Sequence, residues 1–460
     1  MDFEPTEIIE ETTGQQSQKI IKWAISTALI ALAILLCGGF IGYYAFNQIV
    51  GQLDEGDLAE LTAPLFAGRP TRNQIAYIGN DRNVWRVTPD GTDPYQITVD
   101  SKGYRFPTWA PDSRRVAFIG PEGDNRSVLY ISPAAESAPS VLFEDKDAAP
   151  FYLYWAPDSQ SITFLTQEAS GLSMRQANVN NPTKNRILEE GAPFYWVWSP
   201  SGDRLLMHVG GSRGTSAEAH ISLLDNKEEA NRVQLNLEPG GFQAPLWSAD
   251  GSHFFFIAAA DNKKPAIYKT EAETLTETKV TDLDGFAYMI LALDGEHIAY
   301  LQIERGNRPP FGTAYLISTS GEDRKKLTDR LVGSMYWSPD GNKLAVLTLA
   351  ESDDGSTAKV GGQAAPLPQE LTLRWWIYEV AADKLDPLIS FTPTGEFLQT
   401  VPYFDQYHLS LTFWSPDSRY LVLTKSNASG PGGTVWVVDT SGEEEPQQVG
   451  EGTIAVWSWQ

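Results

Sequence analysis

The sequence has 460 residues, of which 42% are hydrophobic and 20% are charged, so it can bury a sizeable core and is not disordered as a whole. Its 35 basic against 59 acidic residues give a net charge of −24, which is repelled by phosphate backbones and argues against a nucleic-acid reader. The one cysteine, Cys37, excludes a disulfide within the chain and a cysteine-based zinc site.

The N-terminal part of the chain predicts one membrane-spanning helix. No charged residue occurs from Trp23 to Leu53, and about 20 apolar residues suffice to cross a bilayer core. The apolar run is too long for a cleaved signal peptide, and no suitable cleavage site follows it closely. We expect a short acidic tail at residues 1–18, a transmembrane signal anchor at 19–47 and a linker at 48–71.

The basic residues near this helix predict its orientation. Lys19 and Lys22 directly precede the helix, and acidic residues follow it, so the N-terminus is expected in the cytoplasm. Everything after the helix then lies outside the cytoplasm. Gly38 and Gly42 form a GxxxG pattern that lets two helices approach closely, although glycine is common in membrane helices in any case.

A five-residue motif recurs along residues 72–460. The first position of each copy is Trp or Leu and the second is a small residue. The third is usually Pro, the fourth is usually Asp, and the fifth is Gly or Ser. A strand with alternating side chains follows each copy. Successive copies are 43 to 49 residues apart except for the last interval of 77, and they begin at Trp109, Trp155, Trp198, Trp247, Leu291, Trp337 and Trp414. Four short antiparallel strands fit into about 45 residues, which is the size of one propeller blade.

The aspartates of the motif are expected to build turns. Proline presets the backbone of a tight turn, aspartate bonds its own backbone, and glycine accepts a positive φ. We therefore predict a structural role, and no carboxylate cluster, for Asp112, Asp158, Asp250, Asp294, Asp340 and Asp417.

The W-[SA]-P-D-[GS] repeat resembles the repeat of TolB-type β-propellers of bacterial envelope proteins. It is also related to the propellers fused to prolyl oligopeptidase and dipeptidyl peptidase hydrolases. The resemblance covers residues 72–460 and implies a propeller fold. The chain differs from TolB in having more repeats and a membrane helix, and in lacking the N-terminal α/β domain.

The two ends of this region are expected to close the ring. Residues 72–98 supply three strands without a tryptophan-bearing inner strand, and residues 453–460, which include Trp457, supply an inner strand with no blade after it. The prediction is therefore an all-β, eight-bladed β-propeller, closed by the C-terminal strand joining the N-terminal blade and preceded by one transmembrane α-helix.

Two long segments interrupt the blade that begins at Trp337, and both belong to the face opposite the motif turns. Residues 351–370 are small and polar, whereas residues 391–408 are rich in aromatic side chains. We predict that 391–408 binds a partner, with packing over the channel mouth as the open alternative. The candidate partner-binding residues are Phe397, Tyr403, Phe404, Asp405, Gln406, Tyr407 and His408.

One pattern resembles an enzyme motif. Residues 210–214 match GxSxG, but they fall in a loop between two strands, whereas the hydrolase nucleophile elbow needs a strand, a turn and a helix. We therefore predict that the chain is not an enzyme, and we predict no catalytic, cofactor-binding or metal-binding residue.

Together these features predict a single-pass protein of the plasma (inner) membrane with a periplasmic propeller. We expect it to bind or scaffold protein partners within a bacterial envelope or membrane complex. Two alternatives stay open: a small-ligand or glycan sensor that uses the central channel, and a regulatory propeller that works with a separate hydrolase chain.

Overall fold

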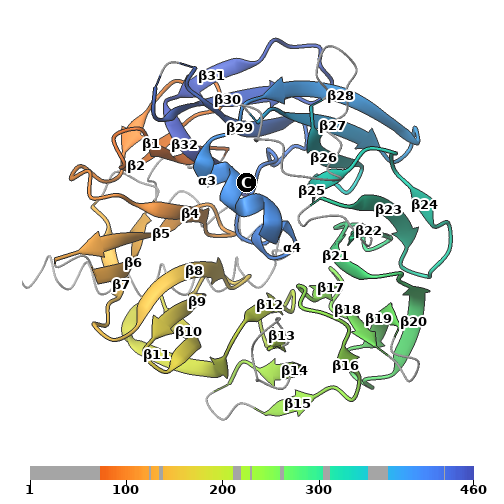
Figure 1. The fold of residues 1–460 in the computed structure, drawn as a ribbon. Helices are drawn as coiled ribbons and strands as arrows, with labels where there is room; N and C mark the ends of the chain where they lie inside the picture. Colours follow the sequence, from red (N-terminus) through yellow and green to blue (C-terminus); the bar gives the residue numbers. More distant parts are fainter. Residues whose placement is uncertain are drawn as a thin grey trace, which may run out of the picture. The chain divides into compact units, whose positions relative to one another are not determined.

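Eight antiparallel sheets surround a central axis in the computed structural model (Figure 1). The structure describes residues 73–460 except 124–125, 134–137, 211–218, 228–230, 260–263, 304–310, 351–370 and 429. The predicted eight-bladed propeller is confirmed. The predicted tail, membrane helix and linker, most of the GxSxG loop and the segment 351–370 lie outside the described residues. Among the described residues, no helix combines the length and the apolar character needed to cross a membrane.

Blade 1 joins the two ends of the described chain. From the channel outward it contains β32 (Gly452–Trp457), β1 (Ile75–Gly79), β2 (Val84–Val87) and β3 (Tyr95–Gln96). Strand β1 pairs antiparallel with β32, with Ile75 opposite Trp457 and Tyr77 opposite Ala455. The predicted closure of the ring is therefore confirmed, and it leaves no open sheet edge between the first and last blades.

The other blades follow in chain order, each from the channel outward. Blades 2 to 4 contain β4 (Arg105–Trp109), β5 (Arg115–Glu122), β6 (Arg126–Pro133) and β7 (Ser140–Phe143); β8 (Ala149–Trp155), β9 (Ser161–Glu168), β10 (Gly171–Asn178) and β11 (Asn181–Gly191); and β12 (Phe194–Trp198), β13 (Arg204–Val209), β14 (His220–Asp225) and β15 (Arg232–Gln234).

In blade 5 two short strands share the inner position, and in blade 8 the inner position is taken by the segment 411–414, which forms a bridge from Trp414 to Leu421. Blades 5 to 8 contain β16 (Glu238–Pro239), β17 (Leu246–Trp247), β18 (His253–Ala259), β19 (Pro265–Glu271) and β20 (Glu277–Asp282); β21 (Phe286–Leu291), β22 (His297–Ile303), β23 (Thr313–Ser318) and β24 (Lys325–Lys326); β25 (Val332–Trp337), β26 (Lys343–Leu349), β27 (Leu373–Glu379) and β28 (Lys384–Phe391); and β29 (Tyr420–Ser426), β30 (Gly433–Asp439) and β31 (Gln447–Gly450).

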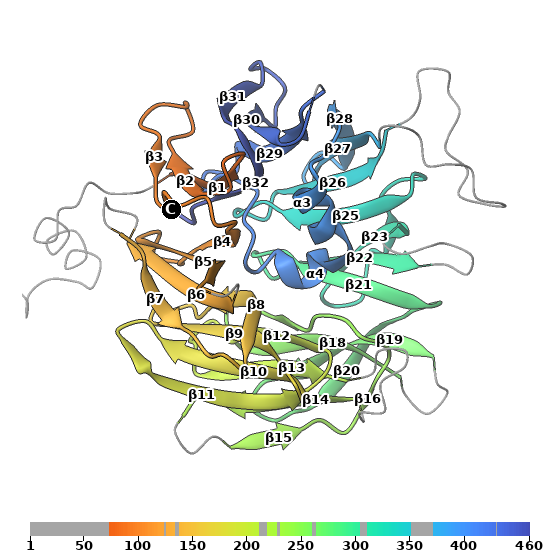
Figure 2. The same ribbon diagram turned by 60° about the vertical axis from the view of Figure 1, so that its left-hand side comes forward.

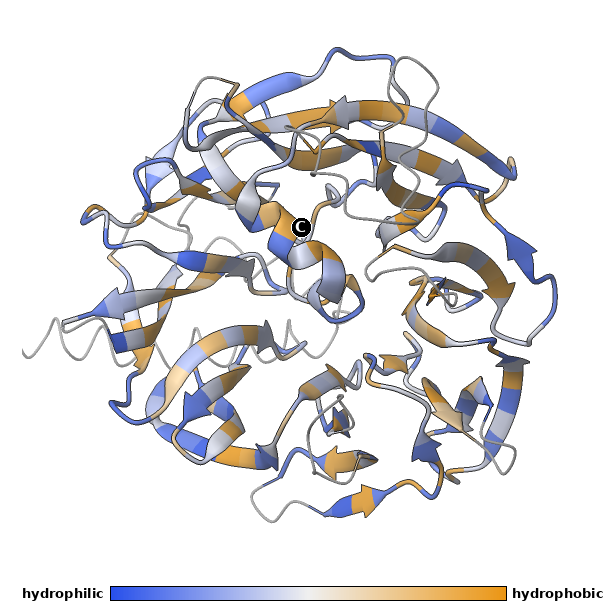
Figure 3. Cartoon of the chain, in the orientation of Figure 1, coloured by the Kyte–Doolittle hydropathy of each residue, from blue (hydrophilic) through white to orange (hydrophobic). Residues whose placement is uncertain are grey.

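Burial decreases from the inner strands to the outermost ones. All five residues of β1 are buried, whereas β20 at the rim of its blade has no buried residue. Each second strand packs against neighbouring blades on both faces of its sheet, so both sets of its alternating side chains are covered. This explains why these strands are continuous hydrophobic runs, and Figure 3 shows hydrophilic residues gathered on outer strands such as β24.

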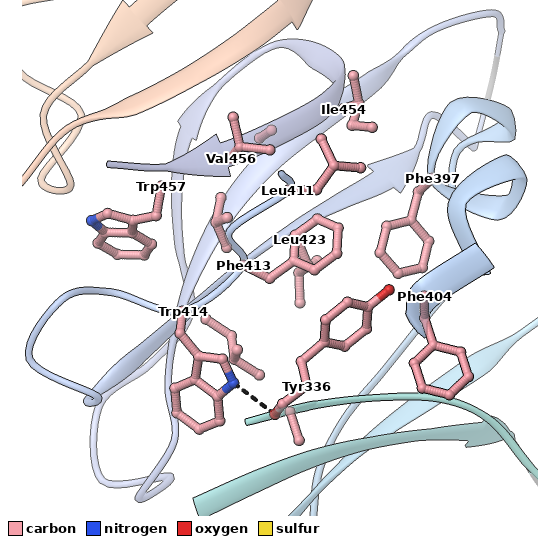
Figure 4. Close-up of a cluster of buried hydrophobic side chains, with 14 of the residues drawn as sticks. Tyr336, Phe397, Phe404, Leu411, Phe413, Trp414, Leu423, Ile454, Val456 and Trp457 are labelled. Carbon is pink, nitrogen blue, oxygen red and sulfur yellow. Dashed lines mark hydrogen bonds between the residues drawn. The ribbon is translucent and has the colours of Figure 1, made fainter. Parts of the chain in front are cut away.

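The motif tryptophans connect neighbouring blades. The indole N–H of Trp155 donates to the carbonyl of Thr108 over 3.3 Å, and that of Trp414 donates to the carbonyl of Tyr336 over 3.0 Å (Figure 4). Trp109 repeats the pattern toward Val456 over 3.3 Å. In all three cases the acceptor directly precedes the motif position of the preceding blade. The repeat therefore contains its own contact between blades.

The motif aspartates hold their own turns. One carboxylate oxygen of each accepts the backbone N–H two residues further on, over 2.8 to 3.1 Å, in Asp112, Asp158, Asp250, Asp294, Asp340 and Asp417. These carboxylates lie on separate blades and are engaged by turn backbone.

Where the last motif residue is serine, it takes a positive φ that serine rarely adopts. Ser159 has φ 58° and accepts a hydrogen bond from the Asp112 N–H over 3.0 Å, and Ser418 has φ 60° and accepts from the Asp340 N–H over 3.1 Å. Both donors belong to the motif of the preceding blade. Serine therefore adds a second contact between blades at positions where glycine alone would satisfy the turn.

We expect that removal of residues 453–460 abolishes cooperative thermal unfolding of the propeller. The deletion removes most of β32 and the buried side chains of Ile454, Val456 and Trp457. Each contributes about 1.5–3 kcal/mol, a total comparable with the roughly 5–15 kcal/mol that stabilises a whole fold. Circular dichroism during heating measures the loss. A chain lacking only Gln460 keeps β32 and should melt close to the full-length protein, and a longer truncation with an unchanged melting temperature would contradict the composite blade.

Candidate functional site

A helical segment lies in the middle of the ring. We call residues 394–410 the plug. It contains α3 (Gly395–Thr400), the 3-10 helix η2 (Val401–Tyr403) and α4 (Phe404–Tyr407), and it connects the outermost strand of blade 7 to the inner segment of blade 8. Figures 1 and 2 show α3 and α4 beside the inner strands from two directions, and α4 contacts β21 and β25.

Two polar side chains of α4 bind the channel wall. The side-chain amide of Gln406 accepts from the Trp196 N–H over 2.9 Å and donates to the Trp196 carbonyl over 3.1 Å. It therefore pairs with β12 as a neighbouring strand would. A carboxylate oxygen of Asp405 accepts from the Ala244 N–H over 2.9 Å. These bonds fix the plug to blades 4 and 5.

Aromatic rings fix the rest of the plug. The ring of Tyr407 stacks on Tyr152 with centroids 5.0 Å apart, and Phe106 meets it edge-on at 5.2 Å. On the other side of the plug, the ring centroid of Phe404 lies 5.8 Å from that of Tyr288 and 6.4 Å from that of Tyr336.

Further contacts of the plug reach blades 7, 8 and 1. Figure 4 shows Phe397 and Phe404 of the plug facing Tyr336 and Phe413, and the centroids of Phe397 and Phe413 are 5.6 Å apart. The hydroxyl of Thr394 bonds Thr424 of blade 8 over 3.0 Å and the Thr453 carbonyl of blade 1. The plug therefore contacts all eight blades.

The candidate partner-binding residues of the sequence analysis lie in this plug. Four of them are buried, two are half-buried, and Tyr403 is 47% exposed. The aromatic segment packs inside the channel, because its rings fill space that the eight blades leave at the axis. The sequence had left open packing over the channel mouth, and partner binding by this segment stays a prediction. Of the seven candidates, only Tyr403 has a ring that is freely available to a partner. The buried residues are Phe397, Phe404, Asp405 and Gln406, and the half-buried ones are Tyr407 and His408.

On the motif-turn side of the plug the channel is open. A cavity of about 470 Å³, which we call the funnel, has the residues 408–412 as its floor and the motif turns as its rim. The third motif residue of every blade lines it: Pro111, Pro157, Pro200, Ala249, Leu293, Pro339, Pro416 and, at the equivalent position of blade 1, Trp459. The repeat thus builds an eight-membered apolar ring around one end of the channel.

Two blades have a large, exposed apolar side chain at this position, where the other blades have proline or alanine. Leu293 is 57% exposed and Trp459 is 38% exposed. The sequence analysis did not select them, although their signal was present: each is a large apolar residue at a motif position that is otherwise small or proline. They are the residues that a ligand entering the funnel would meet first.

The funnel carries no formal charge. Among its described lining residues there is no aspartate, glutamate, lysine or arginine, and burial lowers the pKa of His408 to about 4, so this imidazole is neutral near pH 7. In a chain of net charge −24, such a surface favours an uncharged, apolar ligand.

The described residues offer one group that could hold a metal ion. Asp294, Glu296 and His297 present ligand atoms within 4.8 Å of one another. All three belong to one motif turn, in which an oxygen of Asp294 already accepts the Glu296 N–H over 2.8 Å. The turn explains this arrangement, and we assign no metal to it.

The fold and the site define an eight-bladed β-propeller whose channel is plugged at one end and open and apolar at the other. No protein-family model matches the chain. The uncharacterized peptidase YuxL of Bacillus subtilis (strain 168) is 25% identical over 163 residues, covering 35% of this chain and 22% of the relative. The chain therefore spans about a fifth of the length of this curated relative.

Solved structures similar to the chain include TolB from Acinetobacter baumannii and a prolyl endopeptidase. TolB is 18% identical, with 55% of this chain and 62% of that chain covered and a TM-score of 0.36. The prolyl endopeptidase is 12% identical, with 80% and 53% covered and a TM-score of 0.48. These likenesses leave the family of the chain open.

The similarity to a peptidase corrects one prediction. The sequence analysis predicted that the chain is not an enzyme because GxSxG falls in a loop of a blade, yet the matched relative carries the name of a peptidase. A GxSxG pattern in a loop between two strands is incompatible with one hydrolase fold only, and enzymes of other folds do not need it. The non-enzyme assignment is therefore withdrawn.

The plug contains an acid in an unusual state. Desolvation by burial raises the pKa of Asp405 from its ordinary value of 3.8 to about 7, and the hydrogen bond from the Ala244 N–H opposes this rise only in part. The other carboxylate oxygen has no hydrogen-bond partner among the described residues. The surrounding side chains are tyrosines, including Tyr195 and Tyr288, and supply no positive charge.

We expect the stability of the propeller to fall between pH 4 and pH 7 through Asp405. The folded chain holds the proton of Asp405 to a higher pH than the unfolded chain does. The contribution of this group to the free energy of unfolding is therefore complete below pH 4 and is lost as the pH rises through about 7. Asp405→Asn stays neutral and should gain stability relative to wild type as the pH rises, by at most about 4 kcal/mol. Urea unfolding at pH 5 and pH 8 measures the part of this difference that develops above pH 5. Glu396→Gln, an exposed acid of the same segment, should give a curve parallel to wild type, and parallel curves for Asp405→Asn would show that Asp405 does not titrate in this range.

Proposed function

We propose that this protein is a protein-binding propeller of a bacterial envelope and that the funnel receives an apolar segment of its partner. The observation that carries the proposal is the uncharged ring of third motif residues around a blind cavity of about 470 Å³. Leu293 and Trp459 leave large apolar surfaces in water at its mouth. Exposed apolar patches of this kind are typical of interaction sites, and aromatic side chains supply much of the binding energy at such sites.

Membrane anchoring and a periplasmic location are part of the same proposal. Their support is the apolar run after Lys19 and Lys22 and the acidic residues beyond it. Asn73, the first described residue, bonds the indole of Trp457 over 2.7 Å, so the chain enters the propeller on the face that bears the funnel.

A charge at the mouth of the funnel should abolish partner binding without unfolding the propeller. Leu293→Asp places a carboxylate in the apolar ring, where a partner's apolar segment would have to desolvate it. A photo-crosslinking amino acid at position 293 first identifies the partner in native membranes. Its recovery with the Leu293→Asp variant should then fall at least about tenfold, a loss of about 1.4 kcal/mol.

The matched control is Val99→Asp. Val99 is 79% exposed and does not line the funnel, so this variant adds the same charge to an exposed apolar position elsewhere. It should retain the partner. Equal recovery with both variants would place the binding surface outside the funnel, and Tyr403 on the opposite face is then the next position to change.

Peptide hydrolysis is a second candidate function, favoured by the similarity to the peptidase YuxL. The activity could belong to this chain or to a hydrolase that works with it. Within this chain, Ser212 of the GxSxG motif is the nucleophile to test.

If this chain hydrolyses peptides through Ser212, the purified protein should cleave a fluorogenic peptide library and Ser212→Ala should reduce the rate on the order of 10⁴-fold or more. Ser216→Ala changes a serine of the same loop and should leave the rate unchanged. No cleavage by the wild-type protein would leave only a separate hydrolase for this second candidate.

A further inference from the structure

A second cavity, of about 240 Å³, lies on the face opposite the funnel, between blades 1 and 2. The turn from β1 to β2, the connection from β3 to β4 and the turn from β5 to β6 surround it. Four of its lining side chains are cationic: Arg82, Lys102, Arg105 and Arg126. Cations gathered around one cavity are unusual in a chain with 59 acidic and 35 basic residues, and they create a local potential opposite to that of the whole protein.

Two of these cations are neutralised within the protein. The ammonium group of Lys102 lies 3.0 Å from a carboxylate oxygen of Asp100 and 3.0 Å from one of Glu122. The guanidinium of Arg126 lies 2.7 Å from Glu144. These pairs form the edge of the cavity.

The other two cations have only neutral partners. Arg82 donates to the backbone carbonyl of Lys102 over 3.2 Å, and Arg105 donates to the hydroxyl of Ser127 over 3.1 Å. No carboxylate of the described residues forms an ion pair with either guanidinium. Both arginines are exposed at the mouth of the cavity, and partial desolvation lowers the pKa of Arg105, an effect that a bound anion would offset.

The backbone is shaped to bring these two guanidinium groups to the cavity. Arg82 itself has a positive φ of 67°, and its guanidinium lies against Gly103, where a Cβ would approach it to 2.4 Å. Strand β4 bulges between Arg105 and Thr108, and the bulge residue Phe106 has φ 55°. A bulge redirects side chains: Phe106 packs on the plug and Arg105 reaches the cavity. Strained non-glycine residues persist where the surrounding structure holds them, often at binding sites.

We propose that this cavity binds a small organic anion through a carboxylate or phosphate group held by Arg82 and Arg105. The planar guanidinium fork matches both groups, and two forks converge here without an internal counter-charge. With a volume of about 240 Å³, the cavity has room for the organic part of the ligand beside its anionic group. The site lies on the other face of the propeller from the funnel and does not depend on the function proposed for it.

Isothermal titration calorimetry of the full-length protein in mild detergent tests the site, with sodium phosphate and sodium citrate as separate probes at constant ionic strength. We expect saturable binding of at least one probe. Arg82→Gln and Arg105→Gln should each weaken it about tenfold or more, because each removes charge-assisted hydrogen bonds. Arg105→Lys keeps the charge without the fork and should bind with intermediate affinity. Binding of citrate alone would identify a carboxylate ligand, and binding of phosphate alone a phosphate ligand.

Arg419→Gln is the control. Arg419 is an exposed arginine of blade 8 that pairs with Glu444 and does not line the cavity, so its replacement should not affect binding. Circular dichroism verifies that each variant is folded, and Arg82 and Arg105 provide two independent positions should one fail. The proposal is overturned if neither probe binds saturably, or if the folded glutamine variants bind with unchanged affinity.

Discussion

The pairing of β32 with β1 is the constraint on which the rest of the structure depends. The strands come from opposite ends of the described chain, so their hydrogen bonds close a ring that consecutive blades alone would leave open. Because the ring is closed, the inner strands of all blades surround one central channel. The indole bond from Trp109 to the carbonyl of Val456 depends on the same closure, because its acceptor lies on β32.

The plug converts this axis into a site with one entrance. Eight inner strands leave a central space, and the plug fills one end of it with the aromatic rings of Phe397, Phe404 and Tyr407. Gln406 completes the hydrogen bonding of Trp196, whereas Asp405 brings a carboxyl group into the same apolar environment at an energetic cost. The plug is therefore both a structural element and the floor of the funnel.

The two faces of the propeller have different chemistry for a structural reason. On one face the inner-to-second connections of blades 2 to 8 are short motif turns, so the third motif position recurs around the channel and, together with Trp459 of blade 1, forms an apolar ring. On the other face the connections vary in length and sequence, which allows a plug at one place and a cationic cavity at another. A repeat supplies uniform surfaces, and its irregular connections supply specific ones.

The sequence by itself determined the number of blades, the motif turns and the closure of the ring, because these follow from short-range patterns and from two incomplete ends that complete each other. Local signals also placed the motif aspartates in turns, since the bond from Asp112 to the Arg114 N–H joins residues two apart. The direction of the aromatic segment was decided only by the tertiary structure. Whether Phe404 faces water or Tyr336 depends on the space at the axis, which is set by eight blades together. The same holds for Arg82 and Arg105, which are 23 residues apart in the sequence and line one cavity only because blade 1 closes next to blade 2.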